Sequence, residues 1–418
     1  MRISPTGRFI AVGVAVLAVI VIVGSAMGGR ISGQATPSSS PRATAVALRS
    51  IAAPAAVTPS ISSSKPSTVP SSSSPSVAPI ATVTNVYAGT GVGMFSPGVA
   101  GFPPRVYVPD EAAGTVVVID PRTFKILSRY KVGASPEHVT PDWDLQRLYV
   151  EASFGDRLAV IDPKTARRVG YHIVRGPYNL YFTLDGRMAI VVLDSSRSGV
   201  GYGGHKQLYF YDRRTWRLIK ALDVPYAGAD HLDFSADGRF FLLSTEYAGW
   251  LVKVDVARMT IVGALRVGGQ PIDVRLAPDG RVFYVANQVR RGVSIIDAAR
   301  PRELGFVRTG RGAHGLAISR DTRWLYVTNR IGRSLSVIDF ATRKVIRTWH
   351  IGGSPDMIAV SPDGKQLWIS NRYGGTVSVI DSQTGRLIKI IRVGGRPHGL
   401  AYFPEPGSLS LGHNGIYR

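Results

Sequence analysis

Residues 315–351, GLAISRDTRWLYVTNRIGRSLSVIDFATRKVIRTWHI, contain four short β-rich runs that are separated by turns. The runs are GLAIS, WLYVTN, SLSVIDF and KVIRTWHI, and each has the length and the β-branched and aromatic content of a strand. No helical period of 3.6 residues competes with this pattern. The stretch therefore predicts one four-stranded antiparallel β-unit.

The same unit occurs seven times after Arg105. An aspartate ends the third run of each copy, and the intervals between these aspartates are 42, 50, 43, 42, 42 and 42 residues. Each copy can bury its faces only against its neighbours, so seven copies predict an all-β, seven-bladed propeller with four antiparallel strands per blade. The first copy lacks an innermost strand. We expect PHGLAYF (397–403), near the C-terminus, to supply it and close the ring. The repeat aspartates are Asp120, Asp162, Asp212, Asp255, Asp297, Asp339 and Asp381.

The residues before the repeat predict export. Phe9–Met27 is a run of nineteen uncharged residues that follows two arginines, and this length can span a bilayer. We interpret residues 1–30 as an uncleaved signal anchor, with a cleaved signal peptide as the alternative. Residues 31–83 are rich in Ser, Pro, Ala and Thr and contain no acidic residue, which predicts a disordered linker. We therefore expect residues 84–418 to be extracytoplasmic, either anchored to the cell membrane or secreted.

The composition excludes several classes of protein. The chain has 418 residues and no cysteine, which excludes a disulfide framework, thiolate zinc sites, iron–sulfur clusters and a cysteine nucleophile. Its net charge of +22 would suit a polyanion such as single-stranded DNA. Much of this charge falls on the outermost strands, however, where it prevents pairing with other sheets. The aromatic residues that would have to stack on bases lie mostly in second strands, which favours packing between blades. They are Tyr149, Trp324, Tyr326 and Trp368.

Several copies share a more specific pattern. RLYVEA (147–152), VFYVANQ (282–288), WLYVTNR (324–330) and LWISNRYGGTVSVID (367–381), with recurring GGxP and SPDG, resemble the YVTN-repeat β-propeller family. The resemblance covers about 315 of the 418 residues. It implies a bacterial or archaeal extracytoplasmic propeller used as a surface or binding module, with more distant similarity to propeller lactonases and cofactor-bearing redox enzymes. It specifies no reaction, and without cysteine the haem and dinuclear copper domains of the redox relatives cannot be built.

Strand direction places the loops that enter the innermost strands on the same face as the loops between second and third strands. Four of the eight histidines fall at the start of an innermost strand. Imidazole nitrogen and carboxylate oxygen are ligands for zinc, copper or manganese, so a divalent metal is one possibility. Its ligands would come from His138, His231, Asp273, His314 and His398. The commoner alternative is that these side chains cap backbone groups and line a wet channel. The residues at this repeat position are His138, Asn179, His231, Asp273, His314, Asp356 and His398.

Strand alternation limits how many of these residues can act together. Successive side chains of a strand point to opposite faces, so we do not expect all seven to form one ring. For the same reason we do not expect adjacent residues such as Asp230 and His231 to work as a pair.

Charged loops lie on the same face, around the opening of the central channel, which we call the mouth. The last blades contribute arginines, among them Arg330, Arg372 and Arg396, whereas the earlier blades contribute carboxylates. We expect one side of the mouth to be cationic and the other side to be acidic. Paired arginine donors suit a carboxylate, a phosphate or a sugar acid, although solvated loop arginines are equally plausible. The longest interval adds Ser195–Gln207 on this face, as a lid or as a tolerated insertion.

Catalytic motifs are absent from the sequence, which contains no G-x-S-x-G, H-E-x-x-H or Walker A pattern. We therefore expect an exported, membrane-tethered and monomeric propeller that binds a ligand or a protein at its mouth. The partner would be an anionic small molecule, a cell-envelope polymer or a protein. One alternative is a metal-assisted lactonase-like or lyase-like enzyme at the channel mouth. The other is a protein that binds single-stranded DNA or another polyanion.

Overall fold

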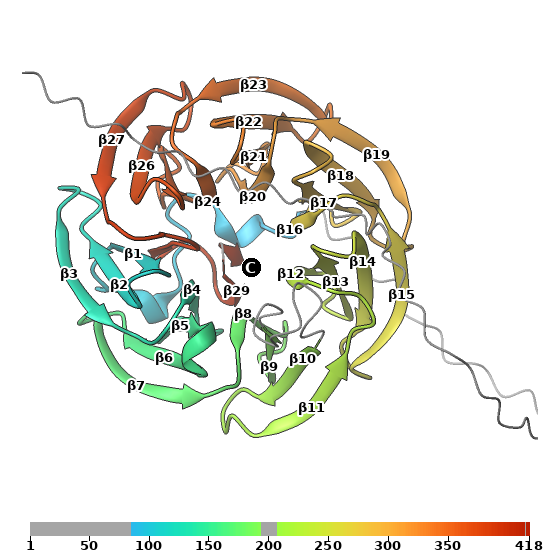
Figure 1. Cartoon of the computed structure of the whole chain (residues 1–418), viewed down its shortest axis with the longest axis horizontal. Helices are drawn as coiled ribbons and strands as arrows, with labels where there is room; N and C mark the ends of the chain where they lie inside the picture. The colour runs from blue at the N-terminus through green and yellow to red at the C-terminus, as the bar shows by residue number, and fades with distance from the viewer. Residues whose placement is uncertain (1–84, 194–206, 414) are drawn as a thin grey trace, which may run out of the picture. The chain divides into compact units, whose positions relative to one another are not determined.

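Seven β-sheets surround a central axis in the computed structural model (Figure 1). The structure describes residues 85–193, 207–413 and 415–418, and these contain no α-helix. The prediction of an all-β, seven-bladed propeller with four antiparallel strands per blade is therefore confirmed. The predicted anchor, the linker and nearly all of the Ser195–Gln207 insertion lie outside the described residues. Within the described part of the chain, no helix has the length and hydropathy needed to cross a membrane.

The blades follow one another in chain order. The first blade contains β1 (Arg105–Asp110), β2 (Thr115–Ile119) and β3 (Ile126–Lys131), and the second contains β4 (Pro136–Pro141), β5 (Leu148–Ala152), β6 (Arg157–Asp162) and β7 (Arg167–Ile173). The third contains β8 (Pro177–Phe182), β9 (Met188–Leu193), β10 (Gln207–Asp212) and β11 (Leu218–Asp223). The fourth contains β12 (Ala229–Phe234), β13 (Phe240–Thr245), β14 (Trp250–Asp255) and β15 (Thr260–Arg266). The last three contain β16 (Pro271–Leu276), β17 (Val282–Asn287), β18 (Gly292–Asp297) and β19 (Glu303–Arg308); β20 (Ala313–Ile318), β21 (Trp324–Asn329), β22 (Ser334–Asp339) and β23 (Lys344–His350); β24 (Pro355–Val360), β25 (Gln366–Asn371), β26 (Thr376–Asp381) and β27 (Leu387–Arg392).

The aspartate that marks the repeat closes the turn between the third and fourth strands. Asp339 Oδ1 accepts the backbone N–H of Thr342 at 2.8 Å and its hydroxyl at 2.9 Å. Asp381 binds Thr384 at the same two distances. The other repeat aspartates accept backbone N–H groups two or three residues later. The residue that reveals the repeat is therefore the one whose side chain stabilises this turn.

The ring closes as the sequence predicts. The short strand β28 (Ala401–Phe403) pairs with β1, with Tyr107 opposite Ala401 and Arg105 opposite Phe403. The first blade thus combines three N-terminal strands with one C-terminal strand. Because neighbouring blades contact only one another, this sheet is where the two ends of the repeat array are joined.

The hydrophobic core lies between neighbouring sheets. Tyr149, Trp324, Tyr326 and Trp368 are 4%, 8%, 1% and 0% exposed, which confirms that they pack between blades. Rings this deeply buried have no free face on which a nucleic-acid base could stack.

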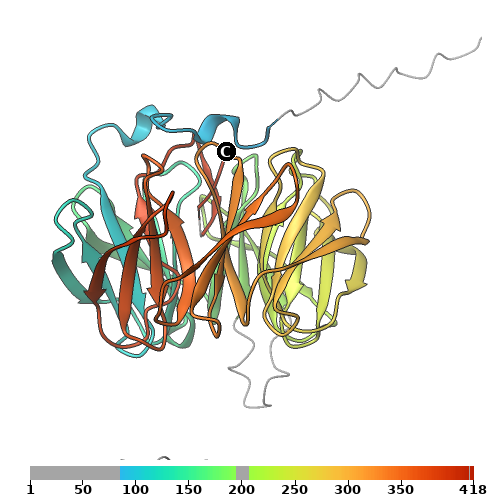
Figure 2. The same cartoon turned by 90° about the horizontal axis from the view of Figure 1, so that it is seen from above.

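The segment before β1 crosses one face of the propeller (Figure 2). This segment contains two short 3-10 helices, η1 (Ala88–Thr90) and η2 (Pro97–Val99). Another short 3-10 helix, η3 (Ser153–Gly155), lies in the second blade after β5. The hydroxyl of Tyr87 donates to the carbonyl oxygen of Leu276 at 2.8 Å, at the end of an innermost strand. The N-terminal segment therefore lies at the face where the innermost strands end.

The C-terminal tail enters the channel. After β28 the chain forms β29 (Ser410–Gly412) and β30 (Ile416–Tyr417), which extend the third blade at its inner edge (Figure 1). The contact with β8 is the single pair of Gly412 and Tyr181. The repeat pattern alone could not place the tail, because the tail follows the last repeat unit.

Candidate functional site

A β-bulge at the start of most innermost strands alters the direction of their side chains. Along β12, pairing with β13 passes from Ala229 opposite Thr245 to Leu232 opposite Leu243, so β12 has one residue more than its partner. The same irregularity occurs in β4, β16, β20 and β24. A bulge breaks the alternation of side chains. As a result, an Asp230 oxygen lies 2.7 Å from His231 Nδ1, and the expectation that these neighbours point apart is wrong.

A cavity of about 360 Å³ opens where the innermost strands begin, on the face opposite the one that Tyr87 contacts. We call it the mouth cavity. Its walls combine carboxylates, arginines and aromatic rings from different blades, and the arginines pair with carboxylates instead of forming a separate cationic side. The charged and aromatic lining residues are Glu111, Glu137, Asp230, Glu246, His314, Arg330, Arg372, Phe154, Tyr178, Tyr247 and Tyr373.

Arg372 joins several groups at the wall of this cavity. Its Nε and Nη2 donate to Glu111 Oε2 at 3.1 and 2.7 Å, and its Nη1 donates to His398 Nε2 at 3.1 Å. Arg396 donates to the other Glu111 oxygen at 2.5 Å. Burial alone would lower the pKa of Arg372, but the surrounding carboxylates, Asp356 first, raise it. This arginine therefore stays charged.

Asp356 is the anionic centre of the adjoining network. It forms an ion pair with Arg330 and lies 3.3 Å from His398 Nε2 and 3.7 Å from His314 Nδ1. Arg330 also contacts Nε2 of His314. Burial alone would raise the pKa of Asp356, but Arg330, followed by His398 and Arg372, holds it below its ordinary value. The structure thus brings six of the predicted site residues into one network, because Arg372 contacts His398 and shares Glu111 with Arg396.

Two other predicted site residues bind the backbone. Asn179 Nδ2 donates to the carbonyl oxygen of Asp230 at 2.9 Å. Asp273 accepts the N–H of Val274 at 2.9 Å and that of Leu316 at 2.8 Å, so it links β16 to β20. These contacts match the alternative in which such residues cap backbone groups. A ligand-binding role for either residue remains a prediction.

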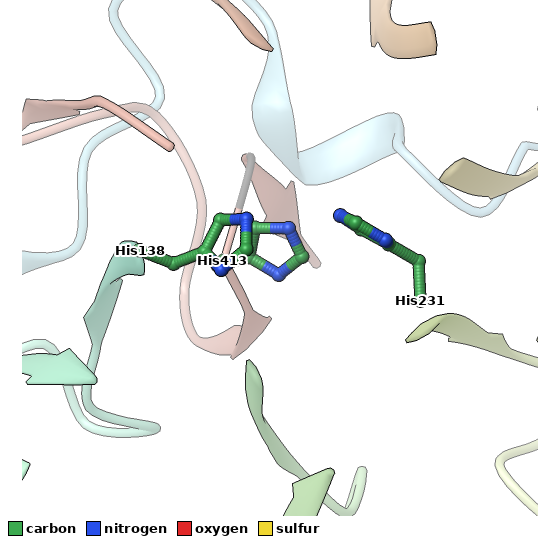
Figure 3. A group of neighbouring side chains, drawn as sticks. All are labelled: His138, His231 and His413. Carbon is green, nitrogen blue, oxygen red and sulfur yellow. The ribbon is translucent and has the colours of Figure 1, made fainter. Parts of the chain in front are cut away.

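Three imidazoles, two from innermost strands and one from the tail, lie close together (Figure 3). His138 and His231 stand one residue further along their strands than the cavity-lining Glu137 and Asp230, and His413 comes from the tail. One nitrogen from each ring lies within 4.8 Å of the others. We call these residues the histidine triad.

Burial keeps the triad uncharged. The three residues are 0%, 0% and 2% exposed. Burial lowers the pKa of His138 to about 3 and that of His231 to about 4, and it places the pKa of His413 well below its ordinary value. All three rings are therefore neutral near pH 7 and have a nitrogen lone pair available.

The triad differs in part from the predicted metal set. His138 and His231 belong to both, whereas His314 and His398 join the network around Asp356. His413 was missed as a ligand because the tail has no repeat register from which its position follows. The available signal was a histidine ten residues after the closing strand of a ring whose other histidines converge.

Comparison with known proteins identifies the family. The family model for the YNCE-like beta-propeller matches residues 75–405. The chain belongs to this family. The expected resemblance to a seven-bladed YVTN-repeat propeller is thereby confirmed. No curated protein matches the chain in sequence.

Solved structures resemble the YNCE-like propeller in fold. The periplasmic gluconolactonase of Pseudomonas aeruginosa is 19% identical, with a TM-score of 0.60, over 72% of this chain and 99% of that chain. A protein of unknown function from Desulfotomaculum acetoxidans is 17% identical, with a TM-score of 0.59, over 71% and 98%. Hydrazine synthase of Kuenenia stuttgartiensis is 18% identical, with a TM-score of 0.56, over 65% and 91%. Function has to be argued from the site, because these likenesses show only the fold.

Proposed function

We propose that this YNCE-like propeller is exported, is tethered to the cell membrane through residues 9–27, and binds a hydroxyl-rich small molecule such as a sugar acid in the mouth cavity. The supporting observation is the lining of a cavity of about 360 Å³, where carboxylate acceptors, arginine donors and tyrosine rings share one space. The volume lies within the usual range for small-molecule sites.

The charged groups of the cavity wall favour a ligand with many hydroxyl groups over a ligand with many negative charges. Arg330 and Arg372 already pair with Asp356 and Glu111, and Glu137 and Asp230 also line the cavity. A polyphosphate would meet these carboxylates, whereas sugar hydroxyls can donate to carboxylates and accept from arginines. The tyrosine rings offer apolar faces to a sugar ring. We therefore narrow the expected anionic ligand to one with a single carboxylate.

Tyr373→Ala tests this proposal. Tyr373 lines the cavity and is 65% exposed, so its truncation should leave the fold intact. We expect about fivefold weaker binding, since stacking on one aromatic ring contributes on the order of 1 kcal/mol. The measurement is calorimetric titration of the full-length protein with a panel of monosaccharides and their acids.

Val289→Ala is the matched control, because Val289 is 58% exposed in a loop of the same face and does not line the cavity. It should bind like the parent protein. A full-length protein that binds no member of the panel, or binding that is unchanged in Tyr373→Ala, would show that the mouth cavity is not the proposed site.

A second candidate function is metal-assisted hydrolysis of a lactone, and the histidine triad is the observation that favours it. A divalent metal held there would supply Lewis-acid chemistry. We place this function second because no triad member lines the mouth cavity. The test is hydrolysis of sugar lactones by zinc-loaded protein, with and without a chelator. Rates equal to the uncatalysed reaction would eliminate this candidate.

A further inference from the structure

We infer that His138, His231 and His413 form a binding site for one divalent transition-metal ion of the zinc or copper type, and that this ion holds the C-terminal tail in the channel. The inference is independent of the ligand in the mouth cavity, because no member of the triad lines that cavity.

The two strand-borne histidines are oriented as metal ligands. His138 Nδ1 lies 3.0 Å from the carbonyl oxygen of Tyr178, which can only accept, so Nδ1 carries the proton. His231 Nδ1 lies 2.7 Å from a carboxylate oxygen of Asp230. Among the described residues, Nε2 of both rings and also Nδ1 of His231 have no hydrogen-bond partner, so the contact of His231 with Asp230 is a close ion-pair distance and not a hydrogen bond. Metal-binding histidines typically donate their second nitrogen to a carbonyl or carboxylate, as His138 does to Tyr178.

His413 completes the set. Neither of its ring nitrogens has a hydrogen-bond partner within the described part of the chain, although the side chain is 2% exposed. Buried polar atoms without a partner are rare in folded proteins. A metal ion between the three rings would satisfy one nitrogen of each residue, and the adjacent Asp230 would offset part of its charge.

The spacing of the rings is compatible with an ion. The ring centroids are 4.3 Å apart for His138 and His413, 4.8 Å for His231 and His413, and 5.4 Å for His138 and His231. Nitrogens bound to tetrahedral zinc lie about 3.4 Å apart. The nitrogens of the triad lie within 4.8 Å of one another, so side-chain shifts of about 1 Å would close the site. Neutral imidazoles suit zinc and copper better than magnesium or calcium.

The position of His413 gives the ion a structural role. The residue lies between β29 and β30, and this part of the tail pairs with β8 only through Gly412. His138 belongs to the second blade and His231 to the fourth. An ion bound to all three residues would therefore connect two blades to the tail beside the intervening blade.

The test is the metal content and stability of the full-length protein, purified without a polyhistidine tag and loaded with Zn²⁺. We expect one bound ion per chain and a melting temperature that falls by several degrees when the ion is chelated. His413→Asn should weaken zinc binding by about 100-fold or more and make the melting temperature insensitive to the chelator. His350→Asn is the control, because His350 is exposed on β23, and it should behave like the parent protein.

Asp230→Asn probes the orientation of His231 without removing a ligand. We expect zinc affinity to fall by roughly 10-fold to 100-fold while the stoichiometry at saturation stays at one. Co²⁺ provides a second readout, since its visible absorption reports nitrogen coordination and should be lost in His413→Asn.

Two results would overturn the inference. One is folded parent protein that binds no metal and has a melting temperature insensitive to chelator and zinc. The other is a His413→Asn variant that still binds the ion with parental affinity. If that variant does not fold, backbone hydrogen exchange of residues 408–417 is measured in the parent protein instead. Chelation of the ion should increase the exchange rate of this segment, and an unchanged rate would contradict the inference. Sugar-acid binding measured in the presence of chelator keeps failure of the metal site distinct from failure of the proposed function.

Discussion

At the scale of single residues, the mouth cavity contains a carboxyl group that folding makes harder to ionise. Glu246 follows β13, lines the cavity and donates its backbone N–H to the carbonyl oxygen of Gly228 at 2.7 Å. Burial, followed by the charge of Asp230, raises its pKa from about 4.5 to about 8, although Arg330 and Arg372 oppose the shift. In the folded protein this group therefore remains protonated near pH 7.

The raised pKa of Glu246 predicts how the stability of the Glu246→Gln variant differs from that of the parent protein at each pH. Between about pH 4.5 and pH 8 the folded protein holds a proton that the unfolded chain has released, so the contribution of Glu246 to stability falls as pH rises through this range. Glutamine cannot ionise. We expect the variant to match the parent protein near pH 4.5 and to be more stable by about 2 kcal/mol above pH 8, after allowance for partial solvent screening. Urea denaturation at several pH values measures this difference, and a difference that does not change with pH would contradict the assignment.

At the scale of elements, the turns between third and fourth strands also connect neighbouring blades. Gly385 lies in the turn between β26 and β27 with φ +72°, and a Cβ there would lie 2.2 Å from the Trp349 ring of the preceding blade. Arg343 occupies the equivalent turn of that preceding blade with φ +56°. The backbone conformation alone therefore does not require glycine, but the indole does.

We predict that Gly385→Ala lowers the free energy of unfolding by about 3 kcal/mol, because both overpacking and left-handed strain contribute. Gly394→Ala is the matched variant, since Gly394 has φ +77° and nothing within 4 Å of the position of its Cβ. Gly394→Ala should lower the free energy of unfolding by only about 1 kcal/mol, because it introduces backbone strain alone. Chemical denaturation of both variants checks the comparison. Equal losses would show that the Trp349 contact does not matter.

The bulges show what a strand pattern does not predict. The repeat correctly placed the start of six innermost strands, whereas the closing strand β28 begins at Ala401, four residues after the expected Pro397. The repeat did not predict that Asp230 and His231 would contact each other, because a bulge depends on pairing between strands, and each strand alone reads as regular alternation.

At the scale of the whole molecule, prediction succeeded where the sequence repeats. Seven aligned copies gave the number of blades, the strand order and the closing role of residues 397–403, because each copy supports the register of the others. The tail has no copy to align with, so the position of His413 could not be predicted. The pairing of Arg330 with Asp356 and of Arg372 with Glu111 was not predictable either, since long side chains from different loops can adopt many rotamers.

The sheet that joins the two ends of the repeat array is also the one that cannot be completed until the C-terminal part of the chain is in place. Until residues 401–403 pair with β1, this strand has no inner neighbour, and the backbone N–H and C=O groups on that side form an unprotected edge. A chain that stops earlier keeps that edge, which is open to pairing with strands of other chains. A chain that ends between Arg392 and Ala401 would therefore keep six complete blades and still be an open, aggregation-prone arc.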